Sequence, residues 1–309
     1  MRMLSLIYVL LFSLNVVSQD PLFFNTNQSL VYTNPSFAGT NGLIRNQFLY
    51  RNQWPTLSAN YVTYYNATDA YINKAKCGLS FIYLHDDISD GLFKRDEFHL
   101  VYAQHIHLFN GKGKLIPSIQ AGYFIRTLDR TKLNFGDMVD STFIPHWGDN
   151  LIPAVRKSNA DFSAGLLFNY RHFYVGFSAF HFTQPDEGLL GVSKLPFRFS
   201  GYLSYNLYFN DKNIFQAQLN YQNQNNANVL IVGGNFLLFN SWLLGASYKS
   251  LDGIVLRSGY RQKYFSLQLG YDVVVSKLSG NTAGSWELSA SFNLRNKEER
   301  GQLLDIERW

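Results

Sequence analysis

The stretch that decides the fold is residues 264–294, which read YFSLQLGYDVVVSKLSGNTAGSWELSASFNL. Apolar residues occupy every second position in both halves of this stretch: Phe265, Leu267, Leu269, Tyr271 and Val273, then Trp286, Leu288, Ala290, Phe292 and Leu294. The positions between them hold mainly serine, glycine, glutamine and asparagine, with one acidic residue in each half. A period of two is typical of β-strands with one apolar and one polar face. Aromatic side chains near the segment ends favour strands that face lipid outward and water inward.

Segments of the same alternating character precede this stretch and are separated by turn residues. They cover residues 44–52, 56–66, 77–85, 97–109, 115–127, 160–170, 173–183, 195–209, 213–223 and 229–239, with four more that begin at Trp242, Ile254, Tyr264 and Ser285. Single-chain bacterial barrels have an even number of strands, and these segments amount to about fourteen. The sequence therefore predicts an all-β fold: a transmembrane, antiparallel up-and-down β-barrel over residues 44–294.

The composition agrees with a membrane barrel. Only 16% of the residues are charged, 17% are aromatic, and the mean hydropathy is −0.13. A soluble globular protein usually carries about a quarter of charged residues. A helical membrane protein would contain apolar runs of about twenty residues, and none follows the first twenty positions. The net charge of +5 is spread along the chain, which gives no indication of a nucleic-acid partner.

The first residues have the pattern of an export signal. Residues 1–18 combine the positive Arg2, an apolar core over residues 4–14 and the small-residue site Val16-Val17-Ser18, as in a secretory signal peptide. Cys77 is the single cysteine, so the chain has neither an internal disulfide nor a cysteine-based metal site. An exported chain with strand alternation is predicted to reside in the outer membrane of a Gram-negative cell as a multi-pass β-barrel.

The connections orient the predicted barrel. Tight turns at residues 110–113, 170–172, 210–213, 240–241 and 261–263 alternate with longer connections at 86–96, 128–159, 184–194 and 277–284. Barrels of this class have short periplasmic turns and longer outer loops, which assigns the tight turns to the periplasm. One longer segment, residues 67–76, is an exception on the periplasmic side.

Two segments lie outside the predicted strands. Residues 19–43 are polar and rich in turn residues such as Asn34-Pro35 and Asn41-Gly42, and we predict a periplasmic lead-in. Residues 295–309 are strongly charged, and we predict a periplasmic tail that is frayed rather than a docking helix.

Charged residues within the strands indicate a candidate site. Arg257, Asp272 and Glu287 lie on the polar parity of three successive segments. A charge that faces lipid at mid-depth costs about 2–4 kcal/mol, so all three are predicted to line the lumen, with Arg257 between or beside the two acids. Such a group either makes the barrel rigid or forms a polar floor that holds or gates a bound segment.

The longest connection is the second candidate site. Residues 128–159 contain Phe143 and Trp147 among polar residues, and an apolar loop of this size is usually functional or folded inward. Two interpretations remain open: the loop packs over the mouth of its own barrel, or it contacts a partner.

Patterns of catalysis and metal binding are weak. His105 and His107 share a strand face, and His99 lies on the same parity, but zinc needs further ligands beside them. Serine, histidine and acid do not converge in the sequence as a hydrolase requires, and residues 111–113 form a turn rather than a phosphate-binding loop. We therefore expect no enzyme activity, no cofactor and no metal.

Several short motifs follow one another along the chain: Gln19-Asp20-Pro21-Leu22-Phe23, Asn34-Pro35-Ser36-Phe37-Ala38-Gly39, Arg51-Asn52-Gln53-Trp54, Tyr248-Lys249-Ser250-Leu251-Asp252, Gly270-Tyr271-Asp272 and Trp286-Glu287-Leu288. In their identity and order the chain resembles the PorP/SprF family of outer-membrane proteins linked to the type IX secretion system of Bacteroidota. The corresponding motifs of that family, in the same order along its chains, are QDPxF, NPxxAG, RxQW, Y[RK]xxD, GYxYD and His-Glu-Ile. Trp286 departs from the family pattern, which has histidine there.

The resemblance implies a barrel that is not an enzyme and that assists the export or surface anchoring of large adhesins. The implied partners are one large secreted adhesin, components of the type IX machinery and outer-membrane lipid. Some family members accompany the core secretion and gliding motility machinery instead. The alternative function is a general or substrate-selective outer-membrane porin, which needs an open lumen. The aromatic loop and the polar lead-in are both candidates to fill the lumen, and a filled lumen would oppose that alternative.

Overall fold

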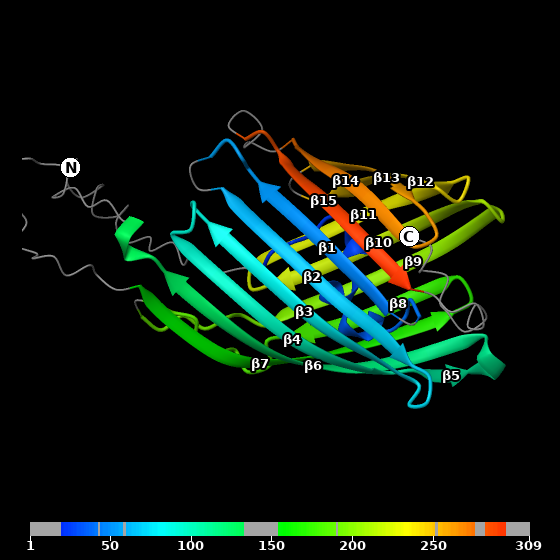
Figure 1. Ribbon diagram of the computed structural model, residues 1–309, viewed down its shortest axis with the longest axis horizontal. Coiled ribbons are helices and arrows are strands. Elements are labelled where there is room, and N and C mark those ends of the chain that lie inside the picture. The colour runs from blue at the N-terminus through cyan, green and yellow to red at the C-terminus, as the bar shows by residue number, and fades with distance from the viewer. Residues whose placement is uncertain are drawn as a thin grey trace, which may run out of the picture.

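The protein is a closed antiparallel β-barrel with a segment of its own chain inside it (Figure 1). The computed structural model describes residues 20–42, 44–57, 60–132, 154–189, 191–250, 253–275 and 282–294. The predicted signal peptide and the predicted tail at residues 295–309 therefore lie outside the described residues.

The barrel wall has fourteen strand positions. Each strand pairs with its neighbours in the chain, β15 closes the wall by pairing with β1, and both β4 and β5 pair with β6. The strands are β1 Ile44–Gln53, β2 Tyr61–Ile72, β3 Cys77–Ile88, β4 Phe93–Gln104, β5 Ile106–Leu108, β6 Gly113–Leu128, β7 Val155–Tyr170, β8 Phe173–Phe180, β9 Arg198–Asn210, β10 Asn213–Gln224, β11 Ala227–Leu238, β12 Trp242–Lys249, β13 Gly253–Arg261, β14 Phe265–Val274 and β15 Ser285–Leu294. The predicted fold class is confirmed.

β4 and β5 together occupy one position in the wall. Ala103 pairs with Ser118 and Ile106 pairs with Leu115, so the register is continuous across the interruption. Pro117 lies in the part of β6 that faces this interruption, and proline has no N–H to donate to the ladder. One predicted strand therefore becomes two short ones.

The alternation in the sequence corresponds to the two faces of the wall. On β14, Leu267, Leu269 and Tyr271 are 43–50% exposed on the outer surface, whereas Gln268 and Asp272 are at most 7% exposed. At β14 the outer surface is thus apolar, as contact with lipid requires, and the inner surface is polar.

The two ends of the barrel differ in their connections. Residues 73–76, 109–112, 171–172, 211–212, 239–241 and 262–264 connect strands at one end. The other end has the short connections 54–60, 89–92, 225–226 and 250–252 and the longer ones 129–154, 181–197 and 275–284. We call these the short-turn end and the long-loop end. The expected long connection at residues 86–96 was wrong, because β3 continues to Ile88 and β4 starts at Phe93. The expected exception at residues 67–76 was wrong, because β2 starts at Tyr61 and continues to Ile72, which leaves a tight turn. The rule for this class of barrel predicts that the short-turn end faces the periplasm.

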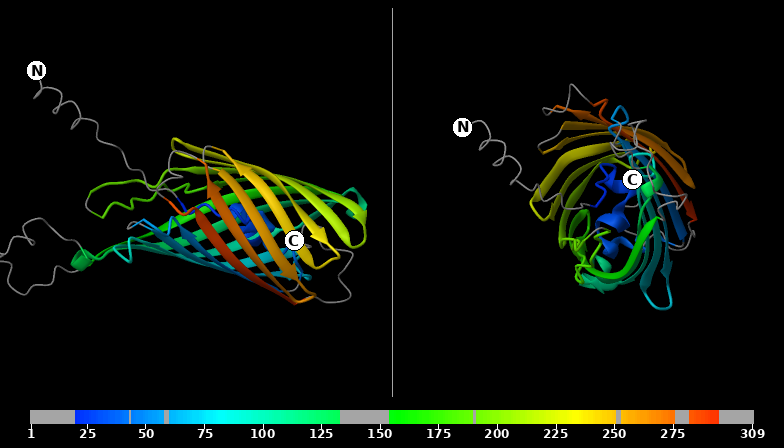
Figure 2. Two further views of the ribbon diagram at one scale, coloured as in Figure 1. Left: turned by 90° about the horizontal axis from the view of Figure 1, so that it is seen from above. Right: turned by 90° about the vertical axis from the view of Figure 1, so that its left-hand side faces the viewer.

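Residues 20–42 lie inside the barrel, and we call them the plug (Figure 2). The plug contains the 3₁₀ turns η1 Thr26–Gln28 and η2 Pro35–Phe37 and the single-turn helix α2 Leu30–Thr33. Residues 23–42 are all buried. The structure therefore places this segment in the lumen rather than in a periplasmic lead-in, because its polar and apolar side chains both find partners on the wall.

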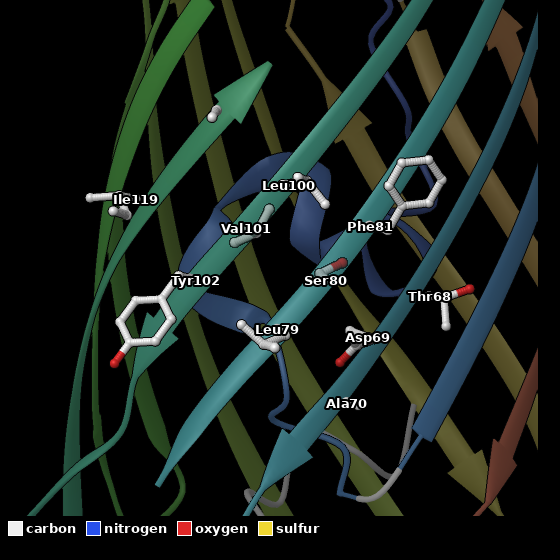
Figure 3. Close-up of a pocket in the computed structure, with 11 residues that line it drawn as sticks. Thr68, Asp69, Ala70, Leu79, Ser80, Phe81, Leu100, Val101, Tyr102 and Ile119 are labelled. Carbon is white, nitrogen blue, oxygen red and sulfur yellow. The ribbon is translucent and has the colours of Figure 1, made fainter. Parts of the chain in front are cut away.

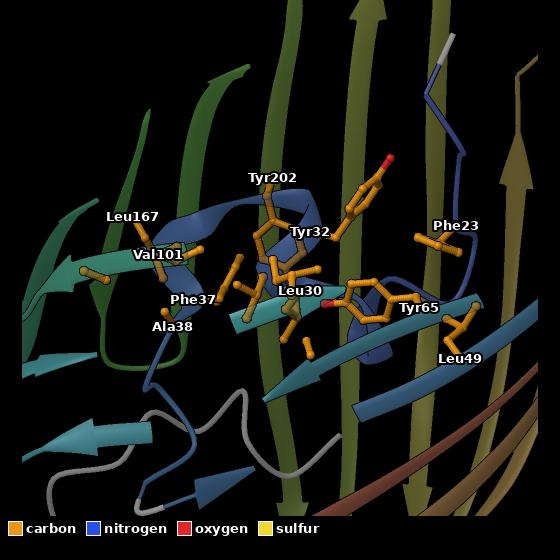
Figure 4. Close-up of a cluster of buried hydrophobic side chains, with 14 of the residues drawn as sticks. Phe23, Leu30, Tyr32, Phe37, Ala38, Leu49, Tyr65, Val101, Leu167 and Tyr202 are labelled. Carbon is orange, nitrogen blue, oxygen red and sulfur yellow. The ribbon is translucent and has the colours of Figure 1, made fainter. Parts of the chain in front are cut away.

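An apolar cluster fixes the plug against one side of the lumen (Figure 4). From the plug it contains Phe23, Leu30, Val31, Tyr32, Phe37 and Ala38, and from the wall Leu49, Tyr65, Ala67, Ile82, Leu84, Val101, Ala103, Ile116, Leu167, Tyr174 and Tyr202. These wall residues belong to strands from β1 to β9, so the apolar side of the lumen is formed by the first part of the chain. Within the described residues, no helix is long and apolar enough to cross a membrane.

Candidate functional site: the seat of the plug

The peptide backbone at Phe24 is clamped between two charged side chains of the wall. The Glu287 carboxylate on β15 accepts hydrogen bonds from the N–H groups of Phe24 and Asn25 at 3.0 and 2.8 Å. The Arg257 guanidinium on β13 donates through Nη1 to the Phe24 carbonyl oxygen at 2.9 Å. Both charged groups therefore form hydrogen bonds with backbone atoms, and these bonds hold the plug at a fixed depth in the lumen.

Gly270 makes room for the ring of Phe24. It is paired with both Arg257 and Glu287 across β13, β14 and β15, so these three residues lie at one level of the wall. A Cβ atom at position 270 would lie 2.6 Å from Cε2 of Phe24. The guanidinium of Arg51 lies 5.0 Å from the centre of the same ring, within the range of a cation–π contact. The ring thus fills a niche that needs glycine on one strand and arginine on another.

The predicted lumen residues all point inward, but each finds another partner than expected. Arg257, Asp272 and Glu287 are at most 7% exposed. Glu287 forms an ion pair with Arg51 at 2.7 Å, and Asp272 forms one with Lys249 at 2.7 Å. The guanidinium of Arg257 bonds to Phe24, Asn235 and Ser247 instead of a carboxylate.

The expected position of Arg257, between or beside the two acids, therefore does not lead to an ion pair with either of them. The alternation along the strands correctly predicted that each residue faces the lumen. It did not predict how deep in the barrel each residue lies, nor that cations on β1 and β12 lie beside the two acids. The other two candidates, Phe143 and Trp147, lie outside the described residues, and their role stays a prediction.

Asn34 fixes the middle of the plug through backbone carbonyl groups of the wall. Its Nδ2 donates to the carbonyl oxygens of Leu166 on β7 and Phe177 on β8 at 3.2 and 3.1 Å, and its Oδ1 accepts from the Ser36 N–H at 2.9 Å. The amide enters a notch between Gly165 and Gly176, where added Cβ atoms would approach it to 2.3 and 2.8 Å. A side chain of this size and polarity therefore specifies the position of η2.

The short-turn end of the plug is held by a carboxylate. Asp69 on β2 accepts a hydrogen bond from the Gly39 N–H at 2.8 Å and forms an ion pair with Arg45 at 2.7 Å. His105 Nε2 lies 3.0 Å from the carbonyl oxygen of Ala38. From this end the chain continues directly into β1.

The long-loop end of the plug is held by a larger group of charges around Asp20. The Asp20 carboxylate lies 2.6 Å from Nε2 of His181, 3.1 Å from Nη1 of Arg198 and 3.3 Å from Nη1 of Arg95. The other ring nitrogen of His181 lies 2.7 Å from Asp161. Burial alone would lower the pKa of His181, but the carboxylates of Asp20 and Asp161 raise it to about 9. The imidazole is therefore a cation at neutral pH and neutralises part of this group.

A segment of the β8–β9 connection turns into the same group. Glu187 is 1% exposed and lies within ion-pair distance of Arg95 and Arg126, at 3.3 and 3.1 Å. Burial raises the pKa of the Glu187 carboxyl, and the two arginines oppose this effect. The connection is thus tied to the wall at the mouth of the barrel, next to the end of the plug.

The histidines considered for a metal site have other surroundings. His99 Nε2 lies 2.8 Å from Glu97, His105 contacts the plug, and His107 is exposed at the short-turn end. Among the described residues no three potential ligands form a cluster suited to a metal ion.

A small cavity lies beside the plug. It has a volume of about 10 Å³ and is lined by Asn27, Asn235, Gly245, Arg257 and Gln268 among others, which is room for about one water molecule. A larger hollow of about 480 Å³ lies outside the barrel over β2, β3, β4 and β6, and Figure 3 shows it with the plug behind the strands. Its apolar side chains, such as Leu79 and Leu100, lie on the surface that faces lipid.

The motifs that carried the family resemblance are largely contacts of the plug. Asp20, Phe23, Asn34, Ala38 and Gly39 belong to the plug itself, as the preceding contacts show. On the wall, Arg51, Gly270 and Glu287 form the Phe24 niche, and Lys249 pairs with Asp272. The sequence contains one indication that these motifs contact the wall of a barrel: apolar residues recur within the otherwise polar residues 20–42.

A closed barrel with an apolar outer surface and a lumen filled by its own N-terminal segment is an integral outer-membrane protein. The chain belongs to the family of type IX secretion system membrane proteins PorP/SprF, whose family model matches residues 15–292. This membership associates the protein with the type IX secretion apparatus in the outer membrane.

Comparisons with individual proteins find only distant likeness. No curated protein matches the sequence. Among solved structures, Omp33 of Acinetobacter baumannii has 9% identity and a TM-score of 0.46, covering 81% of this chain and 96% of that one. The CymD monoaromatic hydrocarbon channel has 11% identity and a TM-score of 0.48, covering 88% and 92%. The toluene transporter TodX of P. putida has 8% identity and a TM-score of 0.46, covering 82% and 89%.

Proposed function

We propose that this protein is a plugged outer-membrane anchor that assists the export or surface retention of a large adhesin secreted by the type IX route. The observation that carries the proposal is the clamped plug: charged wall residues bind its backbone at Phe24, ion pairs hold it at Asp20, and the buried Asp69 carboxylate binds the N–H of Gly39 at its other end. A barrel filled in this way offers its mouths and loops to a partner rather than a path through its centre.

The same observation opposes the porin alternative. About fourteen strands leave a wide lumen when nothing occupies it, but here residues 23–42 occupy it and are buried throughout. Removal of the plug would also break the ion pairs of Asp20 and the backbone hydrogen bonds to Glu287 and Arg257, and it would expose the apolar cluster to water, which is unfavourable. The closed arrangement is therefore the stable one, as an anchor requires and a diffusion channel does not.

The test is deletion of the gene followed by quantitative analysis of proteins at the cell surface. We expect one large surface protein to disappear while other type IX substrates are still exported, and we expect the wild-type gene to restore it. Loss of every type IX substrate would instead identify a core component of the machinery. Unchanged surface proteins together with reduced uptake of small solutes would favour a porin.

A second experiment identifies the partner directly. The tagged barrel is purified from outer membranes in mild detergent, and associated proteins are identified by mass spectrometry. We expect one large secreted protein to be enriched over a preparation of another tagged outer-membrane barrel of similar size. Absence of such a protein, with general channel activity in the purified sample, would contradict the anchor.

A further inference from the structure

The free end of the plug lies at the long-loop end of the barrel. Asp20 contacts Arg198, which is the first residue of β9, and its N–H donates to Gln224, which is the last residue of β10, at 2.9 Å. It also contacts His181, which directly follows β8. All three neighbours mark the end of the barrel where residues 129–154 and 181–197 connect strands.

The other end of the plug lies at the opposite mouth. Gly39 bonds to Asp69 near the end of β2, and β1 begins at Ile44 from the short-turn end. The plug therefore crosses the whole lumen from the long-loop end to the short-turn end before the first strand starts. Figure 2 shows the resulting path along the interior of the barrel.

The orientation of the barrel in the membrane determines on which side of the membrane each end of the plug lies. Because the short turns of such barrels face the periplasm, Asp20 lies at the mouth that faces the cell exterior. The plug is joined covalently to the barrel at its periplasmic end and is held by noncovalent contacts alone at its exterior end.

The site that holds the exterior end is built for a carboxylate. Arg95, Arg198 and His181 converge on Asp20, and the side chains of all three are at most 7% exposed. Charge-assisted hydrogen bonds of this kind are about twice as strong as neutral ones. Glu187 of the β8–β9 connection also contacts Arg95 at 3.3 Å, so a loop on the exterior shares a cation with the plug.

We propose that the N-terminal end of the plug emerges on the cell exterior, where Asp20 latches it into a carboxylate-binding socket formed by Arg95, Arg198 and His181. The periplasmic end of the plug remains joined to β1, so release of the plug begins at the contacts of Asp20 on the exterior side. The inference concerns topology and stands apart from the identity of any adhesin.

Surface display tests the topology. An epitope is inserted immediately before Asp20 in the full chain, and the same epitope is inserted between Asp211 and Lys212 in the β9–β10 turn as the matched control. We expect antibody to bind intact cells that carry the first insertion, and to bind the second only after the outer membrane is permeabilised. The reverse pattern would overturn the proposal.

Chemical labelling tests the latch. In a Cys77→Ala background, Leu22→Cys carries the single thiol, because the chain has one cysteine, and a membrane-impermeant maleimide is added to intact cells. Asp20→Asn should raise the labelling rate at least about tenfold, because it removes the charge that three buried cations bind. Asp20→Glu and the short-turn control Asp211→Asn should leave the rate within about twofold.

Heat-modifiable migration on gels verifies that each variant still forms a barrel. Should Asp20→Asn fail to assemble, His181→Gln provides the same readout with one cation removed, and we expect an intermediate rate. An unchanged rate in assembled Asp20→Asn or His181→Gln barrels would overturn the latch.

Discussion

At the scale of single residues, the buried charges of the lumen are arranged around a peptide. Glu287 is fully buried, and its carboxylate bonds to two plug N–H groups and to Arg51. An unpaired carboxylate in such a place would cost several kcal/mol. Two of its three bonds depend on the seated plug, and the third is the ion pair with Arg51, so Glu287 is a direct reporter of the plug.

The first prediction concerns Glu287→Gln. The variant keeps the shape of the side chain but leaves Arg51 without its acid and directs an amide toward two N–H groups, so the free energy of unfolding should fall by about 2–4 kcal/mol. Urea-induced unfolding in liposomes measures this quantity. Asp211→Asn, an exposed carboxylate on the β9–β10 turn, should change it by less than about 0.5 kcal/mol. Equal effects of the two variants would contradict the clamp.

Gly270 gives a second prediction. Gly270→Ala places a Cβ atom 2.6 Å from the Phe24 ring and should destabilise the barrel by about 1–3 kcal/mol through overpacking. In a Phe24→Ala background the same change should cost much less, so the two substitutions are coupled. Gly201→Ala is the matched control, because its Cβ atom would meet nothing closer than 4.0 Å. Purely additive effects of Gly270→Ala and Phe24→Ala would show that the niche does not bind the ring.

His181 gives a prediction about pH. The groups that face it are Asp20 from the plug, Asp161 from β7 and Arg198 from β9. Its pKa is about 9 in the fold and about 6.5 in an unfolded chain, so the protonated ring stabilises the fold. That contribution, up to about 3 kcal/mol, is complete below about pH 6.5 and is lost as the pH rises through about 9.

The measurement is the difference in unfolding free energy between the wild type and His181→Gln from pH 6 to pH 10. We expect this difference to shrink as the pH rises. A constant difference, or one that grows toward alkaline pH, would mean that the two acids do not hold the protonated ring.

At the scale of elements, the plug is a structural element whose secondary structure consists of single helical turns. Its turns are anchored one by one: Phe24 in its niche, Asn34 in the glycine notch and Gly39 on Asp69. The apolar cluster between these anchors fixes it to the side of the wall formed by β1 to β9. The element is therefore held by contacts with the wall, because helices of a single turn have little stability of their own.

Asn34→Ala tests the central anchor. The substitution removes the bonds to Leu166 and Phe177 and the cap on Ser36, so the unfolding free energy should decrease by about 1–3 kcal/mol. Asn223→Ala is the control, since its side-chain bonds stay within the β10–β11 hairpin. If both variants lose the same stability, the notch has no special importance.

The strands could be predicted from the sequence because lipid and lumen impose a period of two on every one of them. β1 starts at Ile44 and β15 ends at Leu294, and on β14 the inward parity is the expected one. The pairing of charges could not be predicted, because parity gives the face of a residue and only the register gives its depth. Arg257 and Glu287 lie at the same level of the wall. Arg257 binds the carbonyl oxygen of Phe24 and Glu287 binds its N–H, so the two side chains bind the peptide and not each other.

The contacts of the plug could not be predicted for a different reason, although the polar lead-in was one of two candidates to fill the lumen. A segment without periodicity gives no indication of what it packs against, and its many asparagine and serine residues are typical of exposed turns. In the barrel these polar groups meet a polar wall, as when Asn27 bonds to Gln216 and Asn25 to Gln268. The composition of this segment therefore correctly indicated that its side chains form hydrogen bonds, but it indicated an exposed turn instead of a position inside the barrel.

At the scale of the whole molecule, the plug is the feature that distinguishes the proposed anchor from a channel. The lumen of a barrel with fourteen strand positions contains residues 20–42, which are bound to the wall at both ends and in the middle. Unclamping should therefore open a path, and the variants with the largest effect should be those that remove the bonds to the Phe24 backbone.

The most direct test is the ionic conductance of the purified full-length barrel in planar lipid bilayers. We predict that the wild type inserts and stays electrically silent, and that the double variant Phe24→Ala, Glu287→Gln shows frequent openings. The control variant Asp211→Asn should be as silent as the wild type. Steady open-channel conductance of the wild type would contradict the account, because the plug would then not close the barrel.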